Sequence, residues 1–300
     1  MTTSDAPAEA IFDPRWLRLR ADADGRARTP GPAAAFAERL PATPRLLDLG
    51  AGTGANLRHL APRLGRAVQH WTLVDRDRGT LEAVAREMAQ WAARTPGVAL
   101  ARDGRSVAGE GWRAAFATRE LDLSGGLGAD GLGELDLAAF DGVVGTALLD
   151  LVSVDWIRRL VDALVRAGLP VLFTLTVDGR TTWMPADPDD AGVLAGMAMH
   201  QGRDKGFGPA LGARAAQAFA ARLRDAGFRV LCVRSDWRLG ATDRDLLRTL
   251  AGFHADACAA ALPEAATRTA AWLERRTRAA EAGRLRARIG HLDVAAWPRD

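Results

Sequence analysis

Tyrosine is absent from this chain of 300 residues, and lysine occurs only once, at Lys205, so that 39 of the 40 cationic side chains are arginine. Together with the abundance of alanine, this bias indicates a codon-composition effect rather than a basic binding surface. Positive and negative side chains nearly balance, 40 against 37, which leaves a formal net charge of +3. A balance this close gives no strong field for nucleic acid or a membrane, and we expect neither as a partner.

Cysteine is also scarce. Cys232 and Cys258 form no C-x-x-C pair and no zinc-binding spacing, so we expect no bound metal. No apolar run approaches the roughly 18 residues of a membrane helix. The first ten residues, MTTSDAPAEA, carry acids where a secretion signal has basic residues, which favours a cytoplasmic location.

Apolar residues nevertheless make up 48% of the chain, and short apolar runs alternate with helical patterns. The runs predict strands at 45–50, 70–75, 114–123, within 140–152, at 169–177, 228–239 and 287–297. Helical periodicity follows most of them, for example at 56–64, 80–93, 154–168 and 211–226. Such alternation predicts an α/β fold, specifically a Rossmann-like, doubly wound, mostly parallel seven-stranded sheet with helices on both faces.

Two segments lie outside this alternation. Residues 1–40 contain a tail and two short helical patterns broken at TPGP (29–32), and they predict an N-terminal helical cap. Residues 241–283 predict a helical insertion before the last strand, within a main domain that spans 41–300.

The stretch LLDLGAGTGAN (46–56) ends an apolar strand in an acid and then places glycine at every second position. A loop of this kind brings a ligand close to the backbone. The spacing also fits the dinucleotide fingerprint G-x-G-x-x-A, so spacing alone leaves the ligand open. Asp48 distinguishes the two kinds of ligand better than the glycine spacing does. Its carboxylate would repel the pyrophosphate of a dinucleotide at intermediate dielectric but would favour a cationic ligand.

The sequence LDLGAGTGAN followed by WTLVD resembles the class I S-adenosylmethionine-dependent methyltransferase superfamily, over about residues 45–240. The resemblance implies that Asp48 and the loop glycines hold the methionine end and that Asp75 holds the ribose hydroxyls. It also implies that Asp122 meets the adenine amino group, and that the segment after the fourth strand lines the sulfonium. The implied contacts to S-adenosylmethionine are Asp48, Gly50, Ala51, Gly52, Gly54, Asn56, Asp75, Arg76, Asp122, Leu123, Gly145 and Thr146.

Several acceptor classes of this superfamily lack their motifs here. No N/D-P-P-aromatic sequence follows the fourth strand, no Pro-Cys pair occurs, and a Lys-Asp-Lys-Glu mechanism needs more than one lysine. The acids of PADPDD (185–190) could assist a metal, although turn chemistry explains them more simply. These absences favour a small-molecule acceptor.

The segment 181–212 is long and is expected to shape the acceptor pocket. His200, Arg203 and Lys205 are predicted to face the acceptor, with His200 able to take a proton and the cationic pair suited to an anionic acceptor. Asp150, at the end of the fourth strand, is a third catalytic candidate, or it caps the next helix. The alternative for His200 and Lys205 is a structural hydrogen bonder and a solvated charge.

The N-terminal helices could form a lid, with Asp24 and Arg28 as contacts, or could pack as an ordinary amphipathic helix through Trp16 and Leu19. The predicted function is S-adenosylmethionine-dependent methyl transfer to an O or N atom of a small-molecule acceptor. Two alternatives stay open: an NAD(P)-type oxidoreductase, and a protein that binds S-adenosylmethionine for other chemistry, such as cyclisation or elimination, or for regulation.

Overall fold

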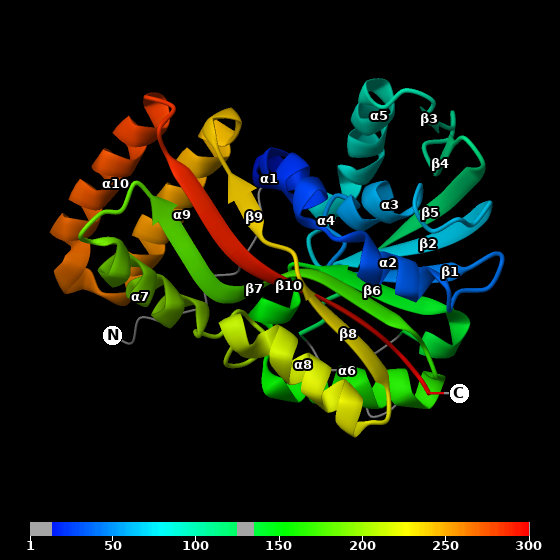
Figure 1. The fold of residues 1–300 in the computed structure, drawn as a ribbon. Coiled ribbons are helices and arrows are strands. Elements are labelled where there is room, and N and C mark those ends of the chain that lie inside the picture. Colours follow the sequence, from blue (N-terminus) through cyan, green and yellow to red (C-terminus); the bar gives the residue numbers. More distant parts are fainter. Residues whose placement is uncertain (1–13, 125–134, 300) are drawn as a thin grey trace, which may run out of the picture.

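The computed structural model describes residues 14–124 and 135–299, which form one ten-stranded sheet with helices on both faces (Figure 1). The strands are β1 (Arg45–Leu49), β2 (Val68–Asp75), β3 (Ala99–Leu100), β4 (Ser106–Gly109), β5 (Trp112–Glu120), β6 (Gly142–Thr146), β7 (Val171–Met184), β8 (Arg229–Arg234), β9 (Trp237–Leu239) and β10 (Arg286–Trp297). The α-helices are α1 (Pro14–Ala27), α2 (Pro30–Ala37), α3 (Ala55–Leu60), α4 (Arg78–Glu82), α5 (Val84–Arg94), α6 (Val154–Ala167), α7 (Asp190–Gln201), α8 (Ala215–Asp225), α9 (Arg244–Ala261) and α10 (Ala266–Glu281).

The sheet is doubly wound. Its strand order is β3-β4-β5-β2-β1-β6-β7-β10-β8, and the five central strands from β5 to β7 are parallel. The chain therefore proceeds outward from β1 in one direction and from β6 in the other. Ligands of open α/β sheets bind at the carboxyl ends of such diverging strands, which here are the residues after Leu49 and Thr146.

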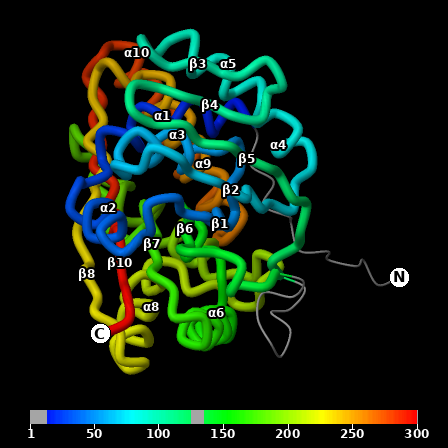
Figure 2. The backbone as a smooth tube through the Cα atoms, turned by 90° about the vertical axis from the view of Figure 1, so that its right-hand side faces the viewer, coloured from blue at the N-terminus to red at the C-terminus, as the bar shows by residue number. Residues whose placement is uncertain are grey.

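The two sheet faces are covered by different helices. Leu47 and Leu49 of β1 pack in a core with α6 and α8, whereas Leu46 packs in a second core with α2, α3 and α5. Figure 2 shows α6 and α8 together on one side of the sheet and α1 and α3 on the other. Because side chains alternate along a strand, Asp48 shares the face of Leu46 and points towards α3.

The predicted α/β class is confirmed, but the strand count of seven is too low. The hairpin of β3 and β4 extends one edge, and β9 is separated from β8 by Ser235 and Asp236. β3 and β4 were missed because they are only two and four residues long and carry little apolar periodicity, whereas β9 was predicted as part of a single strand at 228–239. The glycine-rich stretch SGGLGADGLG (124–133), whose composition predicts a loop, lies, apart from Ser124, outside the described residues.

The fifth predicted strand also ends too early. β7 continues past residue 177 to Met184, and its extension pairs antiparallel with the first half of β10, which begins at Arg286. This ribbon, with α7, α9 and α10 beside it, forms the left-hand part of the molecule in Figure 1. The ribbon and helices share a third apolar cluster that includes Trp183, Trp237 and Trp272.

The acids of PADPDD anchor this part of the molecule. Asp187 and Asp189 accept hydrogen bonds from Arg275 of α10, at 2.6 to 2.8 Å, and Asp190 pairs with Arg276. They are thus ion-pair partners as well as turn residues.

Helices are found in the cap and in the 241–283 segment, while the domain boundary after residue 40 stays a prediction. In the described part of the chain, no helix combines the length and the apolar character that a membrane crossing requires.

Candidate active site

The glycine loop after β1 turns sharply at the diverging strands. Gly50, Gly52 and Gly54 have φ angles of 64°, 53° and 80°, in the left-handed region that favours glycine. A Cβ on Gly54 would lie 2.5 Å from Cε of Met88, so this glycine also permits close packing of the loop on α5. The loop is held by hydrogen bonds from Ala51 N to Val74 O, 2.9 Å, and from Gly52 N to Asp75 Oδ2, 2.8 Å.

A cavity of about 130 Å³ opens over this loop. Its walls come from the loop, the ends of β2 and β6, the segment after β5, and α1. The lining residues include Leu17, Arg20, Asp24, Gly50, Ala51, Gly52, Thr53, Asp75, Arg76, Asp77, Leu121, Leu123, Thr146, Ala147, Leu151, Lys205 and Phe207. The Asp75 carboxylate is fixed by two backbone donors, Gly52 N and Asp77 N, the latter at 3.1 Å.

Seven of the twelve predicted cofactor contacts line this cavity: Gly50, Ala51, Gly52, Asp75, Arg76, Leu123 and Thr146. The other five are placed elsewhere. Gly54 packs against Met88, and Gly145 lies against Phe173, whose Cε1 would be 2.4 Å from an added Cβ. Asp122 is exposed, and its Oδ1 accepts a hydrogen bond from Ser124 N at 2.8 Å, as in an ordinary turn. Asp48 and Asn56 form part of a buried polar chain behind the loop.

This polar chain joins the N-terminal cap to the sheet. Asn56 Nδ2 donates to Asp48 Oδ1 at 2.8 Å, and Arg28 donates to Asn56 Oδ1 and to Thr146 Oγ1, both at 3.0 Å. Asp48 is fully buried, and burial raises its pKa to about 7 despite the hydrogen bond from Asn56 and the charge of Arg28. Asp48 therefore supports the loop from beneath, and the expected direct contact with a ligand has no support in this placement.

Several cavity residues carry no recognisable motif in the sequence. Leu17 and Arg20 come from α1, where the i, i+4 pair of Arg20 and Asp24 looks like an ordinary surface ion pair. In the structure, Asp24 also accepts from Trp237 Nε1 at 3.0 Å, which holds α1 over the cavity. Asp77 could have been identified from the sequence, because D-x-x-T at 77–80 is a helix start that lies two residues after Asp75.

A second cavity of about 880 Å³ adjoins the first. Alternate residues of β7 line one wall, namely Leu175, Val177, Gly179 and Thr181. Helices α7 and α9, β10 and Trp16 supply the other walls. Arg20, Ala147, Leu151 and Lys205 line both cavities, so the two spaces meet at the end of β6.

The structure places three of the four residues predicted near the acceptor in the wall of the larger cavity. His200, Lys205 and Asp150 line the larger cavity, whereas Arg203 does not and instead donates to Ala260 O at 2.9 Å. Burial lowers the pKa of His200 and of Lys205, and it raises the pKa of Asp150 to about 6. Oδ1 of Asp150 is enclosed and has no hydrogen-bond partner in the described part of the chain.

The backbone is strained where the two cavities meet. Ala147 and Leu175 have φ angles of 50° and 55°, in a region that side chains rarely adopt. Leu175 is held there by Asp293, whose Oδ1 accepts from Leu175 N at 2.8 Å and from Ser235 Oγ at 2.5 Å. Strain of this kind concentrates at functional sites.

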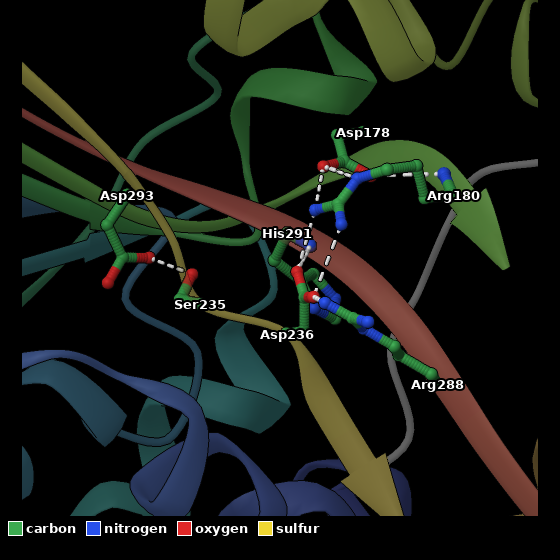
Figure 3. A network of polar contacts seen from close by, with 7 residues as sticks. All are labelled: Asp178, Arg180, Ser235, Asp236, Arg288, His291 and Asp293. Carbon is green, nitrogen blue, oxygen red and sulfur yellow. Dashed lines mark hydrogen bonds and ion pairs between the residues drawn. The ribbon is translucent and has the colours of Figure 1, made fainter.

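Charged side chains also connect the strands of the β7–β10 ribbon beside Asp293 (Figure 3). Asp236, between β8 and β9, accepts from Arg180 of β7 at 2.7 Å and from Arg288 of β10 at 2.8 Å. The Arg180 guanidinium also pairs with Asp178. These hydrogen bonds from two arginines hold the pKa of Asp236 low, at about 2, against the effect of its burial. The network therefore keeps β7, β10 and the β8–β9 connection together beside the cavity.

Within residues 14–124 and 135–299, no group of three or more His, Cys, Asp and Glu side chains is arranged to bind a metal ion. The two cavities form adjoining spaces, one over the glycine loop and a larger one beyond Ala147. Lys205 lines both cavities, whereas Asp150 and His200 line the larger one only.

Comparison of the sequence with protein-family models and with curated proteins finds no match. Among solved structures, a methyltransferase from Thiobacillus denitrificans in complex with S-adenosyl-L-homocysteine is 17% identical, with a TM-score of 0.42 over 96% of this chain and 99% of that one. A cyclopropane-fatty-acyl-phospholipid synthase-like protein from Lactobacillus casei is 18% identical, with a TM-score of 0.46 over 91% of each chain.

An N-methyltransferase from Haemonchus contortus, in complex with phosphomonomethylethanolamine and S-adenosylhomocysteine, is 15% identical, with a TM-score of 0.42. The alignment covers 89% of this chain but only 52% of that one. At these scores the likenesses identify neither the ligand nor the reaction of this chain.

Proposed function

We propose that this chain is an S-adenosylmethionine-dependent methyltransferase that acts on an O or N atom of a small molecule. The observation that carries the proposal is the direct connection between the glycine-loop cavity and the larger cavity, with Ala147, Leu151 and Lys205 common to both. A methyl group must pass between two bound molecules without release, so such an enzyme needs two adjoining sites.

The residues at the loop fit this cofactor. Asp75 lines the cavity and is fixed in place, which suits a pair of ribose hydroxyls. Leu121 and Leu123 offer apolar contact for an adenine ring. A dinucleotide fits less well, because the Gly52 N–H that could bind a phosphate is occupied by Asp75, and Asp77 adds a second acid.

S-adenosylmethionine supplies a methyl group on a positively charged sulfur. The acceptor's lone pair forms the new bond to the methyl carbon while the carbon–sulfur bond breaks and its electron pair stays on sulfur. The chain's task is mainly alignment, which can lower a barrier by about 7–11 kcal/mol. Its remaining task is to receive the acceptor's proton. The Asp150 carboxylate, which lines the larger cavity and has a pKa of about 6, is suited to this in its ionised form.

Thermal unfolding with added ligands tests the proposal. We expect S-adenosylmethionine and S-adenosylhomocysteine to raise Tm, because a ligand at about 100 times its Kd stabilises the folded state by about 2.7 kcal/mol. NAD and NADP should not raise it. Tight binding of either dinucleotide without binding of the sulfur compounds would overturn the proposal in favour of an oxidoreductase.

Asp75→Asn should weaken binding of S-adenosylhomocysteine by roughly tenfold or more, because hydrogen bonds to a charged carboxylate are lost. The matched control is Asp103→Asn, which changes an exposed turn aspartate far from the loop that accepts from Arg105 N. If both variants bind as the original chain does, Asp75 is not a cofactor contact. Release of S-adenosylhomocysteine from S-adenosylmethionine without any methylated product would indicate the non-methylating alternative.

A further inference from the structure

The larger cavity contains a buried histidine that the sequence analysis did not single out. His254, on α9, is only 4% exposed and lines the cavity. Its Nδ1 is enclosed and has no hydrogen-bond partner in the described part of the chain. Burial alone lowers its pKa to about 4, since no charged group acts on it, so the ring is neutral near pH 7.

The surroundings of His254 are apolar. Its ring meets the Trp183 ring edge to face, with centroids 5.5 Å apart and an interplanar angle of 87°. Leu250, Phe253 and Ala257 lie on the same face of α9 and line the same cavity. An apolar side chain at residue 254 would fit these neighbours, and the imidazole instead adds a polar group to this wall of the cavity.

A second imidazole lines the cavity from the sheet. His291 of β10 is 2% exposed, and its ring lies 5.1 Å from the Trp237 ring. Burial, together with the charge of Arg20, lowers its pKa to about 4. The cavity thus presents neutral imidazoles from α9 and β10. Its charged side chains are Arg20 and Lys205, which also line the first cavity, together with Asp150, Arg214 and Asp256.

We propose that the larger cavity binds a predominantly apolar small molecule whose neutral hydroxyl or carbonyl oxygen is hydrogen-bonded by His254. An imidazole suits either oxygen, because it can accept from a hydroxyl or donate to a carbonyl. A charged group at this depth is disfavoured, since neutral rings and apolar walls cannot replace its hydration. The place for an anionic group is beside Lys205.

The identification of this molecule as the methyl acceptor rests on the proposed function. The recognition of the molecule by His254 does not rest on it, because the cavity, the burial of the His254 ring and the lack of a partner for its Nδ1 are properties of the chain itself. A binding experiment without methyl transfer therefore separates the two.

The test uses two probes that differ by one hydroxyl, 4-phenylphenol and biphenyl, with Kd measured by fluorescence titration in the presence of S-adenosylhomocysteine and in its absence. We expect 4-phenylphenol to bind about three to ten times more tightly, the range expected for one net hydrogen bond. In His254→Phe this preference should fall to about one, with biphenyl binding retained. His70→Phe, which changes an exposed histidine of β2, should keep the preference.

A measurement on the unaltered chain guards against misfolding of the variant. The ¹⁵N resonances of the His254 ring should shift when 4-phenylphenol is added and stay nearly unchanged with biphenyl. An unchanged preference in a folded His254→Phe variant, or a failure of both probes to bind, would overturn the inference. If the unaltered chain does not bind S-adenosylhomocysteine but still prefers 4-phenylphenol to biphenyl through His254, only the proposed function is overturned.

Discussion

At the scale of single residues, the site depends on polar groups that are buried behind it. Asp48 and Arg28 do not line the glycine-loop cavity, yet both bond to Asn56, and Arg28 also reaches Thr146. The sequence could show that an acid precedes the glycines. It could not show whether that acid faces the ligand or the layer beneath, because all of Leu46 to Leu49 is buried on both faces of the sheet.

Asp48 should make stability depend on pH. Its folded pKa of about 7 exceeds the 3.8 of an exposed aspartate, so between these values the unfolded chain has lost a proton that the folded chain keeps. Its contribution to the free energy of unfolding is therefore full below about pH 4 and falls by about 1.4 kcal/mol per pH unit up to about pH 7.

Asp48→Asn should abolish this contribution while keeping an oxygen for Asn56 Nδ2. Urea unfolding from pH 4 to pH 8 should show the variant gaining stability relative to the original chain up to about pH 7 and then levelling off. Asp103→Asn should show no such trend. A stability difference that does not vary with pH would contradict a raised pKa for Asp48.

At the scale of elements, the wall of the larger cavity depends on how α10 holds the β7–β10 ribbon. The guanidinium of Arg276 is 3% exposed, pairs with Asp190, donates to Pro185 O at 2.6 Å, and lies over the rings of Trp183 and Trp272. Removing one partner of a buried ion pair leaves the other charge without compensation, at a cost of about 3–5 kcal/mol.

Arg276→Met should therefore lower the free energy of unfolding by a few kcal/mol. Arg278 lies two residues after Arg276 on the same helix and forms an exposed ion pair with Glu274. Arg278→Met removes that pair and should lower the free energy of unfolding by less than about 1 kcal/mol. Chemical denaturation of both variants measures the difference. Equal losses in the two variants would show that Arg276 does not anchor the ribbon.

The elements differ in how well the sequence predicts them. β1, β2 and β6 are short buried runs next to turn residues, and they were predicted within a few residues. The extension of β7 over DGRTTWM was not, because its polar residues take their place from pairing with β10, more than a hundred residues away. The position of His254 in the cavity wall was missed for a similar reason: its helix has an ordinary apolar face, and only the fold leaves a cavity against that face.

At the scale of the whole molecule, α1 connects the two cavities. Leu17, Arg20 and Asp24 line the glycine-loop cavity, while Trp16 and Arg20 line the larger one. Trp16 meets the Phe253 ring of α9 with centroids 4.8 Å apart. One helix from the N-terminal cap therefore borders both cavities. Its Trp16 and Leu19 also pack against the third apolar cluster, as the alternative of an ordinary amphipathic helix predicts, and the lid stays a prediction.

If α1 is a lid, its opening must break contacts with a bound nucleoside, and ligand binding must therefore slow that opening. We expect S-adenosylhomocysteine to slow amide hydrogen exchange in α1 as well as in the loop after β1. Helix α10 provides the internal control, because none of its residues lines either cavity. Slower exchange in the loop with no change in α1 would show that the helix is a fixed wall. A helix that does not open independently of the rest of the fold has no local opening for the ligand to slow, so its amide exchange would not change.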